Sequence, residues 1–191
     1  MPSTIDILGL TADEFAAKAS TVLPSGAGVA MQLYAQVFRE GRFAPEELPL
    51  SAASIAAWKT VFSLAPLTIA RLAEEPTQFD LTAKAILRTH DNYEIECVRI
   101  PMGESQTLCL SSQVGCRMGC TFCETGRMGL LRNLSAGEIV AEVLTARTTL
   151  GWQPRNLVFM GMGEALDNAD NVIQALKVLT CLLYTSPSPR D

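Results

Sequence analysis

Residues 116 to 123 have the sequence Cys-Arg-Met-Gly-Cys-Thr-Phe-Cys, in which three cysteines follow the spacing C-x3-C-x2-C. Thiolates are soft ligands that favour iron–sulfur clusters or zinc. Three closely spaced cysteines can hold three corners of a [4Fe–4S] cluster and leave the fourth iron free for another ligand. Zinc instead favours four protein ligands, and Cys97, Cys109 or His90 could supply the fourth. The spacing alone leaves both alternatives open.

A second motif lies downstream of the cysteines. The apolar run from Asn156 to Met160 is typical of a buried strand, and it is followed by Gly161-Met162-Gly163-Glu164. Glycines let the backbone approach a ligand closely, and a glutamate accepts hydrogen bonds from an ammonium group. Alone, the motif indicates only a tight turn from strand to helix. Together with the cysteine loop it is typical of a site for S-adenosylmethionine (SAM).

The rest of the chain divides into a helical part and an α/β part. Thr11 with Glu14, and Ser135 with Glu138, form capping boxes that predict helix starts. The expected helices in the first part are Ala12–Ser20, about Val29–Glu40, Ser51–Phe62 and a short one after Pro66 that carries Leu67, Ile69 and Leu72. Further on we expect a hairpin from 83–88 and 93–100, a strand at Thr107–Ser111, a helix after Ser135 with one apolar stripe, and a helix at Asn168–Thr180.

These elements predict four regions. Residues 1–78 are expected to form a helical accessory domain, 79–104 a β-hairpin connector and 105–180 the beginning of a βα-repeat core. Residues 181–191, with Ser-Pro-Ser-Pro, resemble a translated sequencing-adaptor tail and do not continue the pattern. We therefore expect the natural protein to continue differently beyond Thr180.

Composition limits the class of protein. Of the 191 residues 48% are hydrophobic and 18% are charged, which predicts a folded chain, and the net charge of −5 argues against nucleic-acid binding by bulk positive charge alone. The sequence shows no signal peptide and no apolar run long enough for a membrane span. We expect a cytoplasmic protein without membrane partners, in which clustered cysteines indicate metal binding or catalysis more than disulfides.

Two blocks of sequence carry a family resemblance. The first is Leu108–Cys116 with the cysteine loop, Thr125-Gly126, Gly129 and Arg132-Asn133-Leu134; the second is Val158–Glu164 with Leu166, Asn168 and Asp170-Asn171-Val172. From about Glu94 to Leu179 the chain resembles the RlmN/Cfr family of radical SAM rRNA (adenine) methyltransferases. The resemblance implies an α/β fold, with an N-terminal helical accessory domain followed by the start of a radical SAM partial (β/α) barrel, truncated in this sequence.

The resemblance also implies an activity. Members methylate C2 of an adenine in 23S rRNA, and some also act on a tRNA, with a [4Fe–4S] cluster, S-adenosylmethionine and an electron donor such as flavodoxin. Carried over by position, Cys116, Cys120 and Cys123 would bind the cluster, and Gly163 and Glu164 would contact SAM. Alternatives are a Cfr-like C8 methyltransferase, another radical SAM enzyme, and a zinc-stabilised RNA-binding module.

Two further residues receive roles only from the resemblance. Cys109 would resolve the covalent adduct between enzyme and RNA, and Glu96 would accept the ring proton. Without the resemblance, Cys109 predicts a buried strand thiol and Glu96 an exposed strand carboxylate. Ala165 replaces the family's usual proline, and the methyl-carrying cysteine near the family's C-terminus has no counterpart, since Cys181 is a poor substitute. We therefore expect this chain alone not to complete methyl transfer.

Overall fold

The computed structural model describes residues 4–23, 26–76 and 81–183 of the 191-residue chain. Its helices are α1 (Ala12–Val22), α2 (Gly26–Glu40), α3 (Ala52–Val61), α4 (Glu124–Met128), α5 (Ala136–Thr148) and α6 (Ala169–Leu183), with 3-10 turns η1 (Ile7–Gly9), η2 (Pro45–Glu47) and η3 (Ala165–Asn168). Its strands are β1 (Ile5–Asp6), β2 (Phe62–Ser63), β3 (Thr68–Pro76), β4 (Leu81–Arg88), β5 (Glu94–Met102), β6 (Ser105–Cys109), β7 (Gln113–Cys116), β8 (Gly129–Asn133) and β9 (Asn156–Val158).

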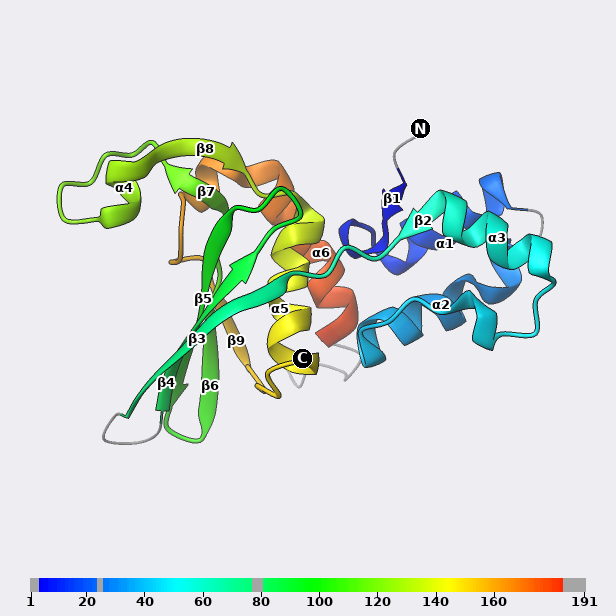
Figure 1. Ribbon diagram of the computed structural model, residues 1–191, viewed down its shortest axis with the longest axis horizontal. Helices are drawn as coiled ribbons and strands as arrows, with labels where there is room; N and C mark the ends of the chain where they lie inside the picture. Colours follow the sequence, from blue (N-terminus) through cyan, green and yellow to red (C-terminus); the bar gives the residue numbers. More distant parts are fainter. Residues whose placement is uncertain (1–3, 24–25, 77–80, 184–191) are drawn as a thin grey trace, which may run out of the picture.

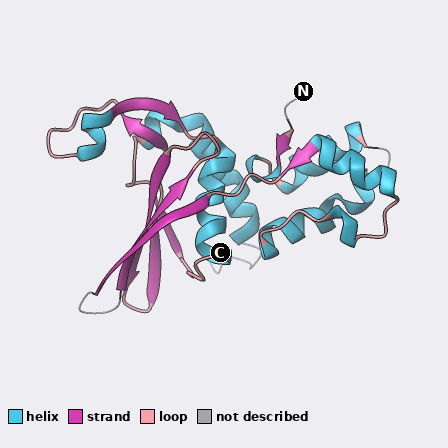
Figure 2. Ribbon diagram, viewed as in Figure 1, coloured by secondary structure: helices cyan, strands magenta, loops and turns pink. Residues whose placement is uncertain are grey.

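The described residues form three layers. A five-stranded mixed sheet has the order β3-β4-β5-β6-β9, in which only the β6–β9 pair is parallel. Helices α5 and α6 lie between this sheet and the helical module α1–α3, and the small antiparallel pair β7–β8 lies at one end of the sheet (Figure 1). The first part of the chain is mostly helical, whereas strands and helices alternate from β7 to α6 (Figure 2), and the chain is α/β with mixed sheets.

The helical module is held together by aromatic side chains. Phe15 contacts the rings of Tyr34, Trp58 and Phe62, with centroid separations of 5.8, 5.8 and 4.8 Å. All four side chains are buried, and they belong to a hydrophobic core that continues into the α/β part. Helix α1 begins with the predicted capping box, because the Thr11 side chain accepts from the Glu14 amide and the Glu14 side chain accepts in return.

The predicted short helix after Pro66 is wrong. Residues 68–76 form strand β3, which pairs antiparallel with β4 from Thr68↔Arg88 to Pro76↔Leu81. Leu67 and Ile69 fit the two-residue period of a strand as well as a helical stripe, and the backbone hydrogen bonds offered by β4 decide between them. The sheet therefore takes up the last part of the region expected to be helical. The expected hairpin, β4–β5, is continuous with the core sheet through β6 rather than a separate connector.

Helix α5 is buried on all sides. Every residue from Ala136 to Ala146 is buried, although the sequence predicted a single apolar stripe. One side faces the sheet (Figure 1), and the other packs against η1, where Ile7 and Leu8 have no exposed surface. Gly137 allows this approach, since a Cβ atom there would collide with the Asp6 carboxylate. The N-terminal segment is thereby fixed to the centre of the α/β part.

The sheet ends at β9, which has no strand partner on its outer edge among the described residues. Next to this edge lies a cavity of about 560 Å³ between β9 and α6. Its lining combines polar and apolar side chains: Pro154, Arg155, Asn156, Leu157, Leu176, Leu179 and Thr180. Within the described ranges, no helix has the length and apolar character that crossing a membrane requires.

Candidate active site

The cysteine loop connects the small sheet to helix α4. Cys116 is the last residue of β7 and is buried, Cys120 is exposed, and Cys123 is the half-buried N-cap of α4. The loop is tightly turned, because the Cys123 amide donates to the Cys120 carbonyl at 3.0 Å and the Met118 amide contacts the Cys116 sulfur at 3.5 Å. Phe122, between the last two cysteines, has 91% of its surface exposed.

The spacing of the three thiols bears on the choice of metal. A tetrahedral zinc ion about 2.3 Å from each thiolate requires neighbouring sulfur atoms about 3.8 Å apart. In the described part of the chain, the group of three ligand atoms gathered within 4.8 Å is His90, Asp91 and Glu138, and the cysteines do not form such a group. A cluster that presents a separate iron to each thiolate tolerates wider spacing. By its chemistry, a donor set of three thiolates fits an iron–sulfur cluster.

The glycine-rich turn docks on the segment between β6 and β7. The Gly161 amide donates to the Leu110 carbonyl at 3.0 Å, and the Met162 carbonyl accepts from the Ser112 and Gln113 amides at 2.8 and 3.2 Å. A Cβ atom on Gly163, whose φ is +98°, would lie 2.6 Å from the Gln113 Cβ. The turn therefore needs a glycine at 163 for packing alone, before any ligand is considered.

Polar side chains join this turn to the cysteine loop. The Gln113 amide group donates to Asp167 at 2.9 Å and accepts from the Glu164 amide at 2.9 Å. Arg117, directly after Cys116, forms an ion pair with Asp167 in η3. Hydrogen bonding to Arg117 lowers the pKa of Asp167. Glu164 is half-buried and caps η3, since it accepts from the Leu166 amide at 3.1 Å.

Cys109 and Glu96 lie on the same face of the sheet. Val98 pairs with Cys109 across β5 and β6, and Glu96 is two residues before Val98, so all three side chains share one face. Burial raises the pKa of the Cys109 thiol, a backbone hydrogen bond from Met160 opposes this, and the nearby Glu142 and Glu96 carboxyls add to it. Glu96 accepts from Lys84 at 3.1 Å. The structure thus brings together two residues that the sequence places thirteen positions apart.

Sequence analysis did not identify Ser111 or Glu142. Ser111 is completely buried; its hydroxyl donates to the Glu96 carbonyl at 2.7 Å and accepts from the Met162 amide at 3.1 Å. Glu142 of α5 is also completely buried and accepts from the Ser111 amide at 3.1 Å. An acidic residue between the apolar positions Val140 and Val143 was the available clue, but a helix with a polar second face explained it equally well.

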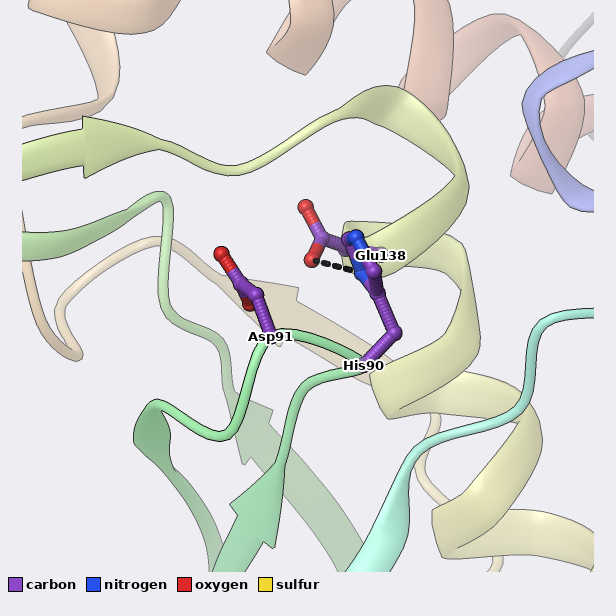
Figure 3. A group of neighbouring side chains, drawn as sticks. All are labelled: His90, Asp91 and Glu138. Atoms are coloured by element: carbon purple, nitrogen blue, oxygen red, sulfur yellow. Dashed lines mark ion pairs between the residues drawn. The ribbon is translucent and has the colours of Figure 1, made fainter. Parts of the chain in front are cut away.

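His90, Asp91 and Glu138 form a cluster at the end of the β4–β5 turn (Figure 3). Arg132 forms hydrogen bonds with both carboxylates. It donates to both oxygens of Asp91 at 2.7 Å and to both oxygens of Glu138 at 2.8 and 2.9 Å. These bonds lower the pKa of Asp91. Burial would raise the pKa of Glu138, but hydrogen bonds from Arg132 and Ser135 outweigh it and the pKa is lowered. The cluster is therefore a structural ion-pair network.

Comparison with known proteins identifies sequence relatives of this chain. A probable dual-specificity RNA methyltransferase RlmN 1 from Protochlamydia amoebophila is 40% identical over 176 residues, which are 92% of this chain and 49% of the relative. A dual-specificity RNA methyltransferase RlmN from Syntrophotalea carbinolica is 50% identical over 126 residues, 64% of this chain and 33% of the relative. No family model matches the chain.

A solved structure agrees with the sequence relatives. The crystal structure of a radical SAM methyltransferase from Sphaerobacter thermophilus superposes with a TM-score of 0.78 at 33% identity, covering 92% of this chain and 52% of that protein. The fold is therefore that of the radical SAM methyltransferase class. Within that class, the chain belongs to the RlmN-like family. It spans about half the length of the first relative and of the solved structure.

Proposed function

We propose that the chain is the cluster- and SAM-binding part of an RNA methyltransferase that acts on C2 of adenine in 23S rRNA, with a tRNA as a second candidate substrate. The family of its relatives supports an RNA substrate. The proposal places the protein in the cytoplasm, with an electron donor such as flavodoxin.

The cysteine loop and the glycine-rich turn each have a proposed role. Cys116, Cys120 and Cys123 would hold a [4Fe–4S] cluster, and Gly163 with Glu164 would hold the amino group of SAM. When bound, the cluster and SAM would supply radical chemistry, which is needed because the electron-poor C2 carbon cannot act as a nucleophile. The ion pair between Arg117 and Asp167 supports this assignment, because it ties the cysteine loop to the turn that ends in Glu164.

Cys109 and Glu96 would act on the RNA adduct. Cys109 would act as a thiolate on the sulfur of the family's methyl-carrying cysteine, so that a disulfide forms while the sulfur–carbon bond to the base breaks and the carbon takes up a proton. Glu96, held by Lys84, would take the proton that leaves the ring. The observation that carries the proposal is the placement of both side chains on one sheet face, with Ser111 joining the strand of Glu96 to the glycine-rich turn.

The first experiment tests the metal. The chain would be purified without oxygen, reconstituted with iron and sulfide, and analysed for bound iron, sulfide and zinc together with the visible spectrum. About four irons per chain and a brown charge-transfer band are expected. One tightly bound zinc without a stable cluster would contradict the proposal and favour an RNA-binding module.

The second experiment tests the RNA target. A chimera would join residues 1–180 of this chain to the remaining part of the Syntrophotalea carbinolica relative, and modified 23S rRNA would be analysed by mass spectrometry. We expect C2-methyladenosine from the chimera and none from its C109A variant. C8-methyladenosine would overturn the proposed position, and no modified adenosine from a chimera that binds cluster and SAM would overturn the proposed substrate.

A further inference from the structure

Glu142 is the least expected side chain near the candidate site. It is acidic, completely buried in the middle of α5, and one of its carboxyl oxygens, Oε1, has no hydrogen-bond partner. Buried acidic residues are rare unless they are paired, because removing a charge from water is costly. Within the described residues no cation pairs with it, so packing alone does not account for its presence.

The second carboxyl oxygen of Glu142 has a specific partner. Oε2 accepts from the backbone amide of Ser111 at 3.1 Å, between residues separated by 31 positions. Ser111 has left strand β6, so its amide has no ladder partner there. A buried backbone amide needs an acceptor, and α5 supplies one from the layer behind the sheet.

Ser111 also contacts both strand β5, which carries Glu96, and the glycine-rich turn. Its hydroxyl binds the Glu96 carbonyl of β5 and the Met162 amide of the glycine-rich turn. Its neighbours Leu110 and Ser112 bond the same turn through their backbones. One buried serine therefore connects the strand of Glu96, the segment that follows Cys109 and the turn that ends in Glu164.

We propose that Glu142 is a positioning residue, which fixes Ser111 through its amide and thereby sets the place of the Gly161–Glu164 turn relative to Cys109. The assignment rests on the proposed function for what the turn and the thiol do, but the contact itself is independent of any ligand.

Burial favours the neutral form of the Glu142 carboxyl group. Burial raises its pKa well above the usual value, the hydrogen bond from Ser111 opposes this, and nearby Glu138 adds to the rise. The other ionisable groups close to it are the thiols of Cys97 and Cys109, whose pKa values are also raised by burial and by Glu142. A protonated carboxyl keeps one acceptor oxygen, which is all that the Ser111 amide needs. A glutamine should therefore replace Glu142, whereas an apolar residue of similar size should not.

The test compares E142Q, E142M and a control, V143A. Val143 is a buried neighbour on α5 that makes no polar contact with Ser111, so V143A reports general loss of packing. Hydrogen–deuterium exchange would be measured for peptides covering 109–114 and 159–165, together with the alkylation rate of Cys109, in the chain without cluster or SAM. For E142M we expect about tenfold faster exchange in both peptides and faster alkylation; for E142Q we expect values within about twofold of the unchanged chain.

Several results would overturn the proposal: unchanged exchange in E142M, equal effects of E142Q and E142M, or the same local pattern in V143A. If E142M does not fold, S111A gives the answer, because it removes the hydroxyl that binds Met162. Faster exchange in 159–165 is then expected, and unchanged exchange there would overturn the proposal. Since none of these readouts needs the cluster or SAM, they remain decisive if the proposed function fails. With SAM present, E142M should also bind it about tenfold more weakly than E142Q.

Discussion

Arg117 and Asp167 form an ion pair between two parts of the chain that lie fifty residues apart. Arg117 directly follows Cys116, the first cysteine of the cysteine loop, and Asp167 lies in η3, directly after the glycine-rich turn. Asp167 also accepts from Gln113. The two proposed ligand-binding segments are thereby joined to each other and to β7 by one carboxylate.

Replacing Asp167 should weaken SAM binding while changing the stability of the fold only slightly. D167N keeps the size of the side chain but removes the charge that holds Arg117, which is largely exposed, so we expect less than about 1 kcal/mol loss in the free energy of unfolding. The affinity for SAM, measured by titration of the reconstituted chain, should fall about tenfold because the turn loses its tie to the loop. Asp170 is exposed on α6, and D170N is the matched control. Equal SAM affinities of D167N and D170N would contradict the assignment.

The cysteines should differ sharply in their contribution to iron binding. C116A, C120A and C123A are each expected to lose most of the bound iron and the visible charge-transfer band after reconstitution, because a cluster held by two thiolates is unstable. C97A is the control, since Cys97 is buried on the opposite face of β5, facing α5. Iron analysis of the purified variants checks this. Retention of iron in all three loop variants would exclude the proposed ligand set.

Gly163 and Gly103 provide a matched test of close packing. Both have positive φ, +98° and +62°, but a Cβ on Gly103 would meet nothing within 4 Å, whereas one on Gly163 would lie 2.6 Å from Gln113. We expect G103A to cost about 1 kcal/mol from backbone strain and G163A about 2 to 4 kcal/mol from strain and displacement of the turn. Urea unfolding curves would measure both. Equal losses would mean that the turn does not pack on segment 110–113 as described.

Arg132 should govern the acid stability of the protein. The pKa values of Asp91 and Glu138 are lowered in the folded state from the ordinary values of 3.8 and 4.5. Their contribution to stability is therefore complete above those values and is lost as the pH falls through the folded-state pKa values. We expect the free energy of unfolding to decrease between about pH 5 and pH 3, and R132M to show a weaker decrease over that range.

At neutral pH the same substitution should destabilise the protein by about 1 to 3 kcal/mol, since it leaves the buried Glu138 carboxylate without its main partner. R127M removes an exposed pair with Glu124 and serves as the control, with little change expected at any pH. Chemical denaturation at a series of pH values measures both effects. An unchanged pH dependence in R132M would show that Arg132 does not set these two pKa values.

Local patterns in the sequence predicted most of the fold. The capping boxes at Thr11 and Ser135 placed the starts of α1 and α5 correctly, because capping depends on residues within one turn. The strand period placed the β4–β5 hairpin. The failure at β3 has a non-local cause: its partner β4 follows it in the chain, and the exposed apolar residues of an edge strand carry no strong period.

In the candidate site, too, the residues that belong to local motifs could be predicted from the sequence, whereas those that depend on distant contacts could not. Family resemblance assigns the cysteines, the glycine-rich turn, Cys109 and Glu96 by motif, and the structure places Cys109 and Glu96 on one face. Ser111, Asp167 and Glu142 could not be assigned, because their roles depend on contacts with residues 31 to 54 positions away. A buried glutamate on α5 is evident only once both sides of that helix are known to be covered.

Helix α5 gives the molecule a single cooperative unit. Helix α5 covers the sheet on one side and contacts η1 on the other. If either the sheet or the N-terminal segment unfolds, buried residues of α5 become exposed, and the part that remains folded loses packing as well. The helical module and the α/β part should therefore melt together, in one calorimetric transition whose van't Hoff and calorimetric enthalpies agree. A disturbance at the N-terminal segment would then reach the site through shared stability, without any direct contact.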